Sequence, residues 1–324
     1  MRILNTIGRV YTEAAKPILE KIGDVDYRDL TQEELKTIIG DYEIAVVGLG
    51  LTFNKEVLAA GKNLKVVATA TTGLDHIDTK FAEERGVTIL SLRGENEFLD
   101  TITGTAELAC GLMIDLLRFT PWAFDDVKVY RWDREKFRGH NLYSLTLGVF
   151  GMGRLGKWMA RYGKAFGMRV LYTDPYVTKS PVEVCTSVSF DELLKESDVL
   201  SLHVHLNDET RGVFDENAFK KMKKGAYLIN TARGGIVDEK ALLEALKRGG
   251  IAGYGTDVLT DETNFNKEFN DPSTGLRASH PLVEYAKDHK NVIILPHIGG
   301  MTAESRERTD VFIAEKVKMF FDAR

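Results

Sequence analysis

The stretch "LGVFGMGRLG" (147–156) decides the fold. Gly151, Gly153 and Gly156 form the pattern G-x-G-x-x-G, after an apolar run and before the helical pattern "RLGKWMARYGKAFG" (154–167). In such a strand–turn–helix unit the first glycine permits the turn, the second lets backbone approach a pyrophosphate, and the third allows close helix packing. The helix N-terminus adds oriented N–H groups and positive potential. The stretch therefore predicts a dinucleotide site, although a glycine-rich turn without a ligand stays the alternative.

The following run, "RVLYTD" (169–174), ends in Asp174, 18 residues after Gly156. A carboxylate at this place accepts hydrogen bonds from the adenosine ribose hydroxyls and repels a 2′-phosphate. We therefore expect NAD rather than NADP as the cofactor.

Short β-branched runs alternate with helical patterns in two sets, which predicts parallel strands with right-handed crossovers. The fold class expected is α/β, with two Rossmann-like lobes. The first set is "EIAVVG" (43–48), "KVVATA" (65–70) and "VTILS" (87–91); the second is "LGVFG" (147–151), "RVLYT" (169–173), "VLSLHV" (199–204), "AYLIN" (226–230), "IAGYGTDV" (251–258) and "VIIL" (292–295).

Size and composition are those of a packed globular protein. The 324 residues fit two domains, with 44% hydrophobic and 28% charged residues. The formal charge of −5 and the lack of a basic block argue against nucleic-acid and membrane partners. The N-terminus lacks a signal-peptide core, so we expect a cytoplasmic protein. Cys110 and Cys185 are expected to be structural thiols.

Two helical patterns lie outside the strand sets. Residues 104–118 are apolar around much of the circumference, as expected of a helix buried between lobes or subunits, and Pro121 is expected to end it. Residues 301–321 carry one apolar face, so this helix should pack on a lobe already built, the first lobe being one option. The irregular stretch of about 260 to 281 is a candidate functional loop.

Two residues that follow strands of the second set are candidates for catalysis. Arg233 can clamp a carboxylate and polarise a neighbouring carbonyl, or it can be a structural arginine. His297 can donate a proton to a ketone oxygen as hydride arrives. Glu262, with Asp261 as its rival, is the candidate for holding His297 in the right tautomer.

His203 and His205 stand two apart on an expected strand, so both should lie on one face. A metal site is one interpretation, but no third ligand is evident nearby. A helix-covered or cofactor-facing place is the alternative, and no metal is expected.

The chain resembles the D-specific 2-hydroxyacid dehydrogenases, the group that includes D-lactate dehydrogenases, hydroxypyruvate and glyoxylate reductases and phosphoglycerate dehydrogenases. The resemblance covers nearly the whole chain and is more specific than any single motif. It is carried by "ATTGLDHIDT" (70–79), "TAEL" (105–108), "GVFGMGRLG" (148–156), "INTARGGIVDEKAL" (229–242), "GTDVLTDE" (255–262) and "LPHIGGMT" (295–302).

This resemblance places the family's catalytic residues on Arg233, Glu262 and His297, with Glu262 preferred to Asp261 because it stands five residues after Asp257. It implies substrate binding by Arg233 and by the backbone of Gly73 and Leu74. The residues expected around NAD are Gly151, Gly153, Arg154, Leu155, Gly156, Asp174, His203, Thr231, Asp257, Gly299 and Gly300.

The resemblance also implies a discontinuous first lobe, into which the cofactor lobe is inserted. The expected boundaries are 1–99 for the first part of the substrate-binding lobe, 100–296 for the NAD-binding lobe, and 297–324 for the returning segment. A homodimer formed through helix 104–118 is implied as well.

The chain departs from the family pattern at several positions. His205 and Thr263 each replace a usual proline, and residues 48–52 stand where phosphoglycerate enzymes often carry an arginine. A phosphorylated substrate is therefore not expected, although Arg93 could substitute for that arginine.

The expected reaction is reversible hydride transfer between NADH and a small 2-keto acid, which gives the D-2-hydroxy acid. A non-catalytic NAD-sensing, corepressor-like module is the alternative from another class. Formate oxidation is disfavoured, because a glutamine would be expected in place of Glu262.

Overall fold

The structure is a computed structural model that describes residues 1–260, 262 and 279–323. The chain forms two compact units: unit 1 contains Met1–Ile102 and the chain from Met301 onward, and unit 2 is Thr103–Gly300. These boundaries lie a few residues C-terminal to those expected from the sequence.

Unit 1 is built on a parallel sheet with the order β2-β1-β3-β4-β5. Its strands are β1 (Arg2–Asn5), β2 (Asp24–Tyr27), β3 (Ile44–Val47), β4 (Val66–Thr69) and β5 (Thr88–Leu90). Its helices in the described part of the chain are α1 (Lys16–Glu20), α2 (Gln32–Ile38), α3 (Lys55–Ala60), α4 (Thr79–Glu84), α5 (Asn96–Leu99) and α14 (Ala303–Asp322), with 3-10 turns η1 (Gly8–Val10) and η2 (Ile39–Asp41).

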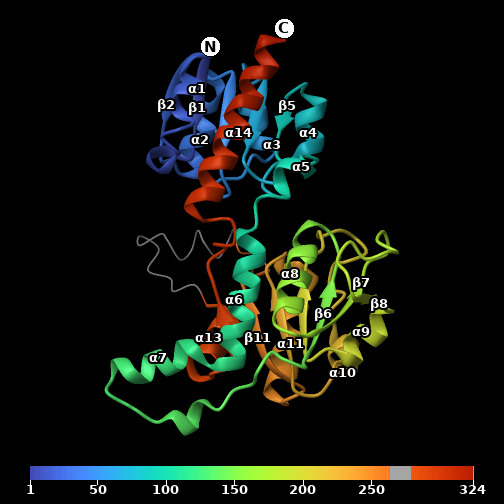
Figure 1. The fold of residues 1–324 in the computed structure, drawn as a ribbon. Coiled ribbons are helices and arrows are strands. Elements are labelled where there is room, and N and C mark those ends of the chain that lie inside the picture. Colours follow the sequence, from blue (N-terminus) through green and yellow to red (C-terminus); the bar gives the residue numbers. More distant parts are fainter. Residues whose placement is uncertain (261, 263–278, 324) are drawn as a thin grey trace. The chain divides into compact units, whose positions relative to one another are not determined.

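Helix α14 completes unit 1, as Figure 1 shows by its red ribbon beside the blue N-terminal strands. Its residues Ile313, Ala314 and Val317 are buried in one apolar cluster with Ile3 and Val46 of the central strands. The expected apolar face of segment 301–321 is therefore confirmed, and it packs on the first lobe.

Unit 2 is built on a parallel sheet with the order β12-β11-β10-β9-β6-β7-β8. Its strands are β6 (Thr146–Phe150), β7 (Arg169–Thr173), β8 (Cys185–Ser187), β9 (Val199–Leu202), β10 (Ala226–Asn230), β11 (Ile251–Thr256) and β12 (Val292–Ile294). Its helices, among the described residues, are α6 (Gly104–Arg118), α7 (Thr120–Lys128), α8 (Arg154–Ala165), α9 (Phe190–Glu196), α10 (Glu216–Lys221), α11 (Glu239–Lys247) and α13 (Pro281–Asp288), with 3-10 turns η3 (Arg134–Phe137) and η4 (Gly234–Ile236).

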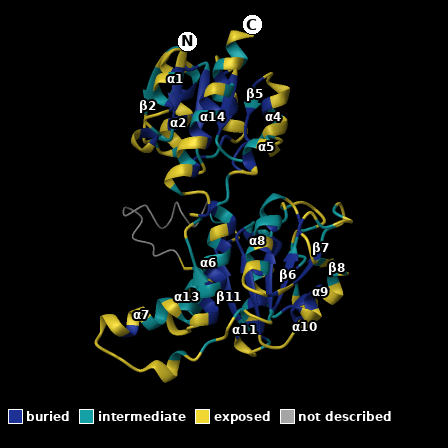
Figure 2. Ribbon diagram, viewed as in Figure 1, coloured by how far each residue is buried: buried dark blue, intermediate teal, exposed yellow. Residues whose placement is uncertain are grey.

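The order of unit 2 creates a topological switch point beside β6. The chain moves outward from β6 to β7 and β8, and then resumes on the other side of β6 with β9. In doubly wound sheets, ligands bind outside the carboxyl ends of the strands at such a point. The strands of both units are largely buried (Figure 2), so these sheets are the rigid frame of any site.

The α/β fold class with two parallel sheets is confirmed, and all the expected strands are present. Three short strands were not expected: β1, β2 and β8, which have the sequences RILN, DVDY and CTS. The strand expected at 199–204 ends at Leu202.

The expectation for Pro121 was wrong in its detail. Helix α6 ends at Arg118, because Phe119 adopts a left-handed conformation with φ of 57°. Pro121 instead lies in the first turn of α7, where its missing N–H group needs no partner. Among the described residues, no helix combines the length and the apolar character that crossing a bilayer requires.

Candidate active site

The glycine-rich turn joins β6 to α8 at the switch point. Gly151 has φ of +94°, and a Cβ atom there would lie 2.6 Å from Val204 Cγ1. A Cβ at Gly156 would lie 1.9 Å from the carbonyl oxygen of Gly151, so the helix packs closely against the turn. A Cβ at Gly153 would meet nothing within 4 Å. The first and third glycines are thus required by the fold, and the second faces open space.

Asp174 follows β7 and lies against the same turn. Its Oδ2 accepts a hydrogen bond of 2.8 Å from the N–H of Met152, and its Oδ1 accepts one of 2.8 Å from the N–H of Tyr176. The contact with Met152 was not expected from the sequence. It fixes the carboxylate beside the turn.

Two buried polar atoms near the carboxyl ends of β9 and β10 have no hydrogen-bond partner among the described residues, namely His203 Nδ1 and Thr231 Oγ1. The other ring nitrogen of His203 is bonded to Ser201 Oγ at 2.8 Å. Burial lowers the pKa of His203 to about 4, so this ring is neutral at pH 7. Because buried polar groups are normally paired, these atoms and the open side of Gly153 fit a polar ligand such as a dinucleotide.

The expectation that His203 and His205 stand on a strand is wrong. Both follow the end of β9 rather than standing on it, and His205 is exposed. In the described part of the chain, no three His, Cys, Asp or Glu residues are grouped so that they could hold a metal ion.

His297 and Glu262 form a hydrogen-bonded pair. His297 Nδ1 lies 2.7 Å from Glu262 Oε1, and the side chains are 30% and 35% exposed. The hydrogen bond to Glu262 raises the pKa of His297, and burial opposes it. His297 therefore holds a proton to higher pH than a free imidazole, while Nε2 stays available for a reacting group. Its φ of 56° is rare for a residue other than glycine.

Asp257 fixes the loop that carries His297. The residue is 1% exposed, and its carboxylate accepts hydrogen bonds from the N–H groups of Ile298 at 2.8 Å and Gly299 at 2.7 Å. Burial raises the pKa of Asp257, and the two N–H groups oppose that shift. The residue thus acts through the backbone of the loop, with its carboxylate turned away from solvent.

Arg233 follows β10 and belongs to the same cluster. One guanidinium nitrogen donates to the carbonyl of Ala232 at 2.7 Å. Its positive charge lowers the pKa of His297, so the two groups are close enough to interact. The next residue, Gly234, is tightly packed, because a Cβ there would lie 2.1 Å from the carbonyl carbon of Leu259. The structure therefore brings together Arg233, Glu262 and His297, which come from three separate segments of the chain.

The remaining expected residues lie as follows. Arg154 and Leu155 begin α8, and Gly300 is exposed after the loop of His297. Gly73 and Leu74 lie in unit 1, in the turn after β4, where Thr71 Oγ1 donates to the carbonyl of Gly73 at 2.7 Å. Asp261, Thr263 and most of the stretch 260–281 lie outside the described residues.

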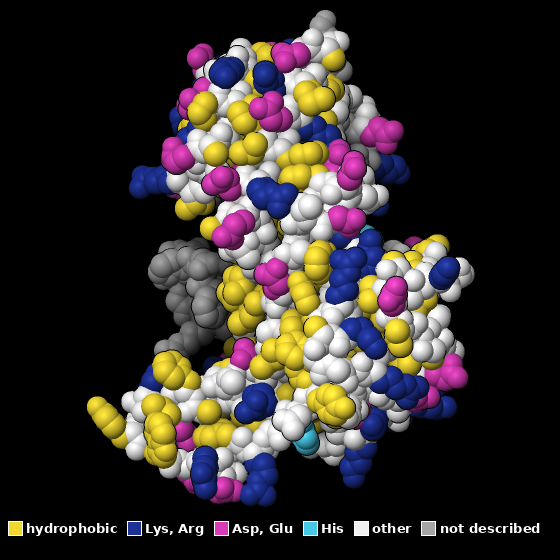
Figure 3. All heavy atoms as spheres, viewed as in Figure 1, with side chains coloured by type: hydrophobic (Ala, Val, Ile, Leu, Met, Phe, Trp, Pro, Cys, Tyr) yellow, Lys and Arg dark blue, Asp and Glu magenta, His cyan; other side chains and the backbone are white. Residues whose placement is uncertain are grey.

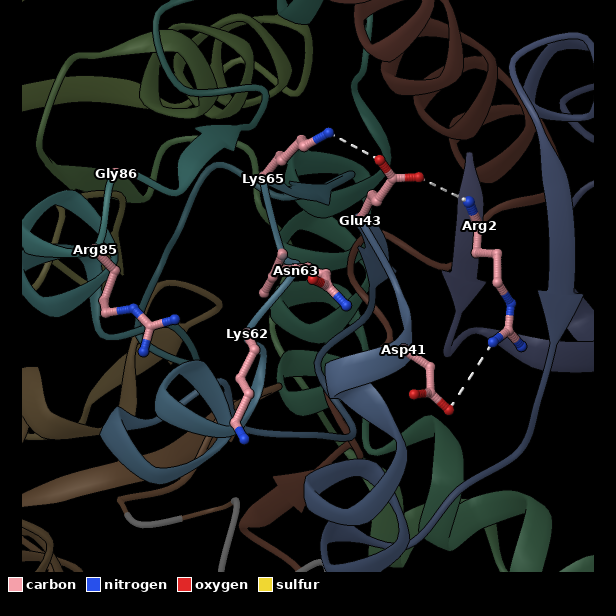
Figure 4. A pocket seen from close by; sticks show the side chains of 9 residues that line it. Arg2, Asp41, Glu43, Lys62, Asn63, Lys65, Arg85 and Gly86 are labelled. Atoms are coloured by element: carbon pink, nitrogen blue, oxygen red, sulfur yellow. Dashed lines mark hydrogen bonds and ion pairs between the residues drawn. The ribbon is translucent and has the colours of Figure 1, made fainter.

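A recess of about 550 Å³ in unit 1 lies at the amino ends of the strands, where Arg2, Glu43 and Lys65 line it (Figure 4). Its charged side chains are Arg2, Asp41, Glu43, Lys62, Lys65 and Arg85, and Glu43 accepts from Lys65 Nζ at 2.8 Å and from the backbone N–H of Arg2 at 3.2 Å. Ligands of parallel sheets bind at the carboxyl ends, so this recess is not the active site.

Comparison with known proteins identifies the family of the chain. A family model described as "D-isomer specific 2-hydroxyacid dehydrogenase, NAD binding domain" matches residues 110–299. The chain is 36% identical over 313 residues to D-3-phosphoglycerate dehydrogenase of Methanocaldococcus jannaschii. This alignment covers 94% of this chain and 55% of that protein. It is 35% identical to hydroxypyruvate reductase of Thermotoga maritima, in an alignment that covers 91% of this chain and 90% of the reductase. The chain thus spans about half the length of the phosphoglycerate dehydrogenase.

Solved structures show the same fold over the whole chain. D-lactate dehydrogenase from Aquifex aeolicus, complexed with NAD and lactic acid, matches with a TM-score of 0.83 and 31% identity, covering 100% of this chain and 96% of that one. The TT0316 protein from Thermus thermophilus matches with a TM-score of 0.82 and 33% identity, covering 100% and 98%.

Proposed function

The chain belongs to the D-isomer-specific 2-hydroxyacid dehydrogenase family, and on that premise we propose that it interconverts a small 2-keto acid and the D-2-hydroxy acid with NAD as cofactor. The observation that carries the proposal is the His297–Glu262 pair, with a 2.7 Å bond and a raised pKa on the imidazole, beside Arg233. A proton donor, its carboxylate partner and a carboxylate-binding guanidinium are the groups that reduction of a 2-keto acid needs.

Each catalytic residue has a defined part in the proposed reaction. His297 donates its Nε2 proton to the keto oxygen in reduction, and accepts a proton from the hydroxyl group in oxidation. Glu262 favours the protonated ring and fixes its tautomer by accepting from Nδ1. Arg233 orients the substrate carboxylate and polarises the carbonyl group.

The turn at Gly73 and Leu74 is proposed to bind the substrate carboxylate through backbone N–H groups. Its own carbonyl at Gly73 accepts from Thr71, while the N–H groups of Gly73 and Leu74 donate to no acceptor among the described residues. Free N–H groups at the carboxyl end of a parallel strand suit an anion.

NAD is the cofactor of the family's binding domain, and when bound it supplies the hydride acceptor or donor. We propose that the turn from Gly151 to Gly156 cradles its pyrophosphate and that Asp174 accepts from the ribose hydroxyls. Thr231 Oγ1 and His203 Nδ1 would bind polar groups of the same cofactor, because both atoms are buried without partners in the described structure. Its surroundings would be completed by Arg154, Leu155, Gly299 and Gly300, with Asp257 holding the backbone of the loop that carries Gly299.

We propose an unphosphorylated substrate. The loop after β3 holds Gly48, Leu49 and Gly50, and its end is tied to Gln32, whose side-chain oxygen accepts from the N–H of Thr52 at 2.9 Å. This loop presents no cation for a phosphate group.

A substrate scan tests the proposal. Purified protein with NADH is assayed against glyoxylate, hydroxypyruvate, pyruvate and longer 2-keto acids, with phosphohydroxypyruvate as the phosphorylated comparison. We expect turnover of at least one unphosphorylated acid, in preference to the phosphorylated one. No turnover of any 2-keto acid would overturn the proposed activity. The NAD-sensing alternative is not favoured, because the relatives reported above are enzymes.

We also propose a homodimer, with an interface that extends beyond helix 104–118. The apolar side of α6 is used inside unit 2, where Ala109, Leu112 and Met113 are buried in its core. Figure 3 shows hydrophobic side chains gathered over α7 and the segment after it. The exposed large side chains there are Phe124, Val127, Val129, Tyr130 and Trp132.

Such an apolar patch on the surface favours a second copy of the chain as its cover. Sedimentation should give a dimer for the wild type and a shift toward monomer for the double variant Tyr130→Ser/Trp132→Ser. A wild type that sediments only as monomer contradicts this part of the proposal.

A further inference from the structure

We infer that Glu239 is a positioning residue, which holds the loop that carries Glu262 in the geometry that the acid–base pair requires. The inference rests on the proposed function, because it assigns a role in the same site to a residue that lies outside the catalytic cluster. It is carried by two hydrogen bonds of the Glu239 carboxylate and by the close packing of the loop.

Glu239 is the first residue of α11, directly after the N-cap residue Asp238. Its Oε1 accepts from the N–H of Thr260 at 2.7 Å, and its Oε2 lies 3.1 Å from His280 Nε2. The side chains of Glu239 and His280 are only 16% and 12% exposed. A carboxylate in a first helical turn commonly faces solvent and interacts with the helix dipole, whereas this one is turned inward onto two partners.

The two partners bracket the segment that contains Glu262. Thr260 lies two residues before Glu262, and His280 is the N-cap residue of α13. One carboxylate thus joins the end of the β11 loop to the start of α13. The buried Leu282 anchors α13 in the core of unit 2, so the second partner is itself fixed.

Glu239 and Glu262 accept hydrogen bonds from neighbouring residues of the chain. The N–H of Leu259 donates to Glu262 Oε2 at 3.3 Å, and the N–H of Thr260, the next along the chain, donates to Glu239. The Leu259–Thr260 peptide also packs against Gly234, where a Cβ would lie 2.1 Å from the Leu259 carbonyl carbon. This peptide is therefore fixed by contact with Gly234 and by the hydrogen bond to Glu239.

A fixed peptide at 259–260 fixes the carboxylate that follows it. Glu262 accepts a hydrogen bond from the N–H of Leu259 at Oε2, and its Oε1 is bonded to His297. The position of its carboxylate therefore depends on the backbone of its own loop. Catalytic groups need placement to within about 0.5 Å, and a misplacement of about 1 Å can cost on the order of 100-fold in rate. Loss of the Glu239 carboxylate should therefore weaken the pairing of Glu262 with His297.

The test compares Glu239→Ala, Glu239→Asp and Glu239→Gln with the control Glu244→Ala. Glu244 is on the same helix, but its carboxylate pairs with Lys247 at 3.1 Å on the exposed side. The readouts are kcat and KM for the best 2-keto acid, and an NMR titration of the His297 ring, assigned by comparison with His297→Asn. The charged groups that face His297 are Glu262, Asp257 and Arg233.

For Glu239→Ala we expect kcat to fall roughly 10- to 100-fold, with KM changed less than about 3-fold and the pKa of His297 lowered. Glu239→Asp should lie between it and the wild type, since the shorter side chain cannot reach both partners. Glu239→Gln should keep most of the activity, because its amide oxygen still accepts from Thr260. Glu244→Ala should behave as wild type.

The inference would be overturned if Glu239→Ala kept the wild-type kcat and the wild-type pKa of His297 and lost only thermal stability. Glu239 would then have a purely structural role. If Glu239→Ala does not fold, the same two measurements on Glu239→Asp decide the question. The His297 titration needs no turnover, so the inference is tested even if the wild type reduces no 2-keto acid, which would count against the proposed function alone.

Discussion

The glycine-rich turn after β6 and the acid–base cluster after β10, β11 and β12 lie at the same edge of one sheet, yet they are built in opposite ways. The turn depends on side chains that are missing: Gly151 has a left-handed φ, and Gly156 packs where no Cβ fits. The cluster depends on side chains that meet, such as Glu262 and His297, which are 35 residues apart. A site made by the backbone can be identified in ten consecutive residues, whereas a site made by side chains from separate segments is assembled only by the fold.

The two regions also treat histidine differently. His203, near the cofactor turn, is held neutral because burial lowers its pKa to about 4. His297, in the cluster, has a raised pKa because Glu262 accepts its Nδ1 hydrogen bond. Burial opposes the charge at both rings, so the hydrogen-bonded carboxylate decides the outcome. The neutral ring of His203 therefore suits an uncharged polar contact with a ligand, and the ring of His297 suits a proton donor.

The largest effect is expected when the cluster loses its proton donor. His297→Ala should lower kcat/KM by about 10²- to 10⁴-fold, the usual contribution of general acid–base catalysis. Because the cofactor turn is untouched, the Kd for NADH, measured by fluorescence titration, should stay within a few-fold of wild type. A parallel loss of NADH binding would show that the two regions are not independent.

The reciprocal change breaks the turn. Gly151→Ala places a methyl group 2.7 Å from the carbonyl oxygen of His203, at a φ that costs a residue with a side chain about 1–2 kcal/mol. We expect NADH affinity to fall by roughly 10-fold or more, since about 1.4 kcal/mol corresponds to tenfold in binding. Gly153→Ala is the matched control for folding, because its Cβ meets no protein atom within 4 Å. Equal NADH affinity in Gly151→Ala and wild type would contradict the proposed cradle.

A smaller effect is expected from Glu262→Gln, which keeps a hydrogen-bond acceptor but removes the charge. The raised pKa of His297 should fall, so the loss of keto-acid reduction with rising pH should begin at lower pH than in wild type. Oxidation of the hydroxy acid needs the neutral ring and should shift in the same direction along the pH axis. The pH profile of kcat/KM in both directions is the measurement, and an unmoved profile would rule out Glu262 as the cause of the raised pKa.

The same pKa fixes the sign of a stability effect. A raised folded-state pKa stabilises the protein fully below the unfolded value, about 6.5 for histidine, and this contribution is lost as pH rises through the folded value. Thermal denaturation across that window should therefore show a larger decrease with pH in wild type than in Glu262→Gln.

Much of the fold could be predicted from the sequence, because the interior strands are apolar runs with regular spacing. Strands β1, β2 and β8 were missed, since RILN, DVDY and CTS are short and carry polar or charged residues. The end of α6 was misjudged for a related reason: the left-handed Phe119 has no sequence signature, whereas Pro121 is conspicuous but begins the next helix.

The candidate site could be predicted less completely. Arg233, Glu262 and His297 were found as residue types after strands, and the resemblance chose between Glu262 and Asp261. The contact of Asp174 with Met152 and the two bonds of Glu239 had no signal, because Glu239 reads as an ordinary acid in a first helical turn. The positive φ of His297 was equally invisible, since only the fold imposes it.

The smallest effect is expected at Asp174, where the two ways of building a site meet, because a side chain there braces the backbone turn. Asp174→Asn keeps an oxygen for the N–H of Met152 but removes the charge that repels a 2′-phosphate. We expect the preference for NADH over NADPH, as a ratio of kcat/KM values, to fall by several-fold to about tenfold. Asp174→Ala, which also removes the brace, should in addition weaken NADH binding. If both variants kept the wild-type ratio, the carboxylate would be a brace alone, and discrimination between the cofactors would have to come from another part of the turn.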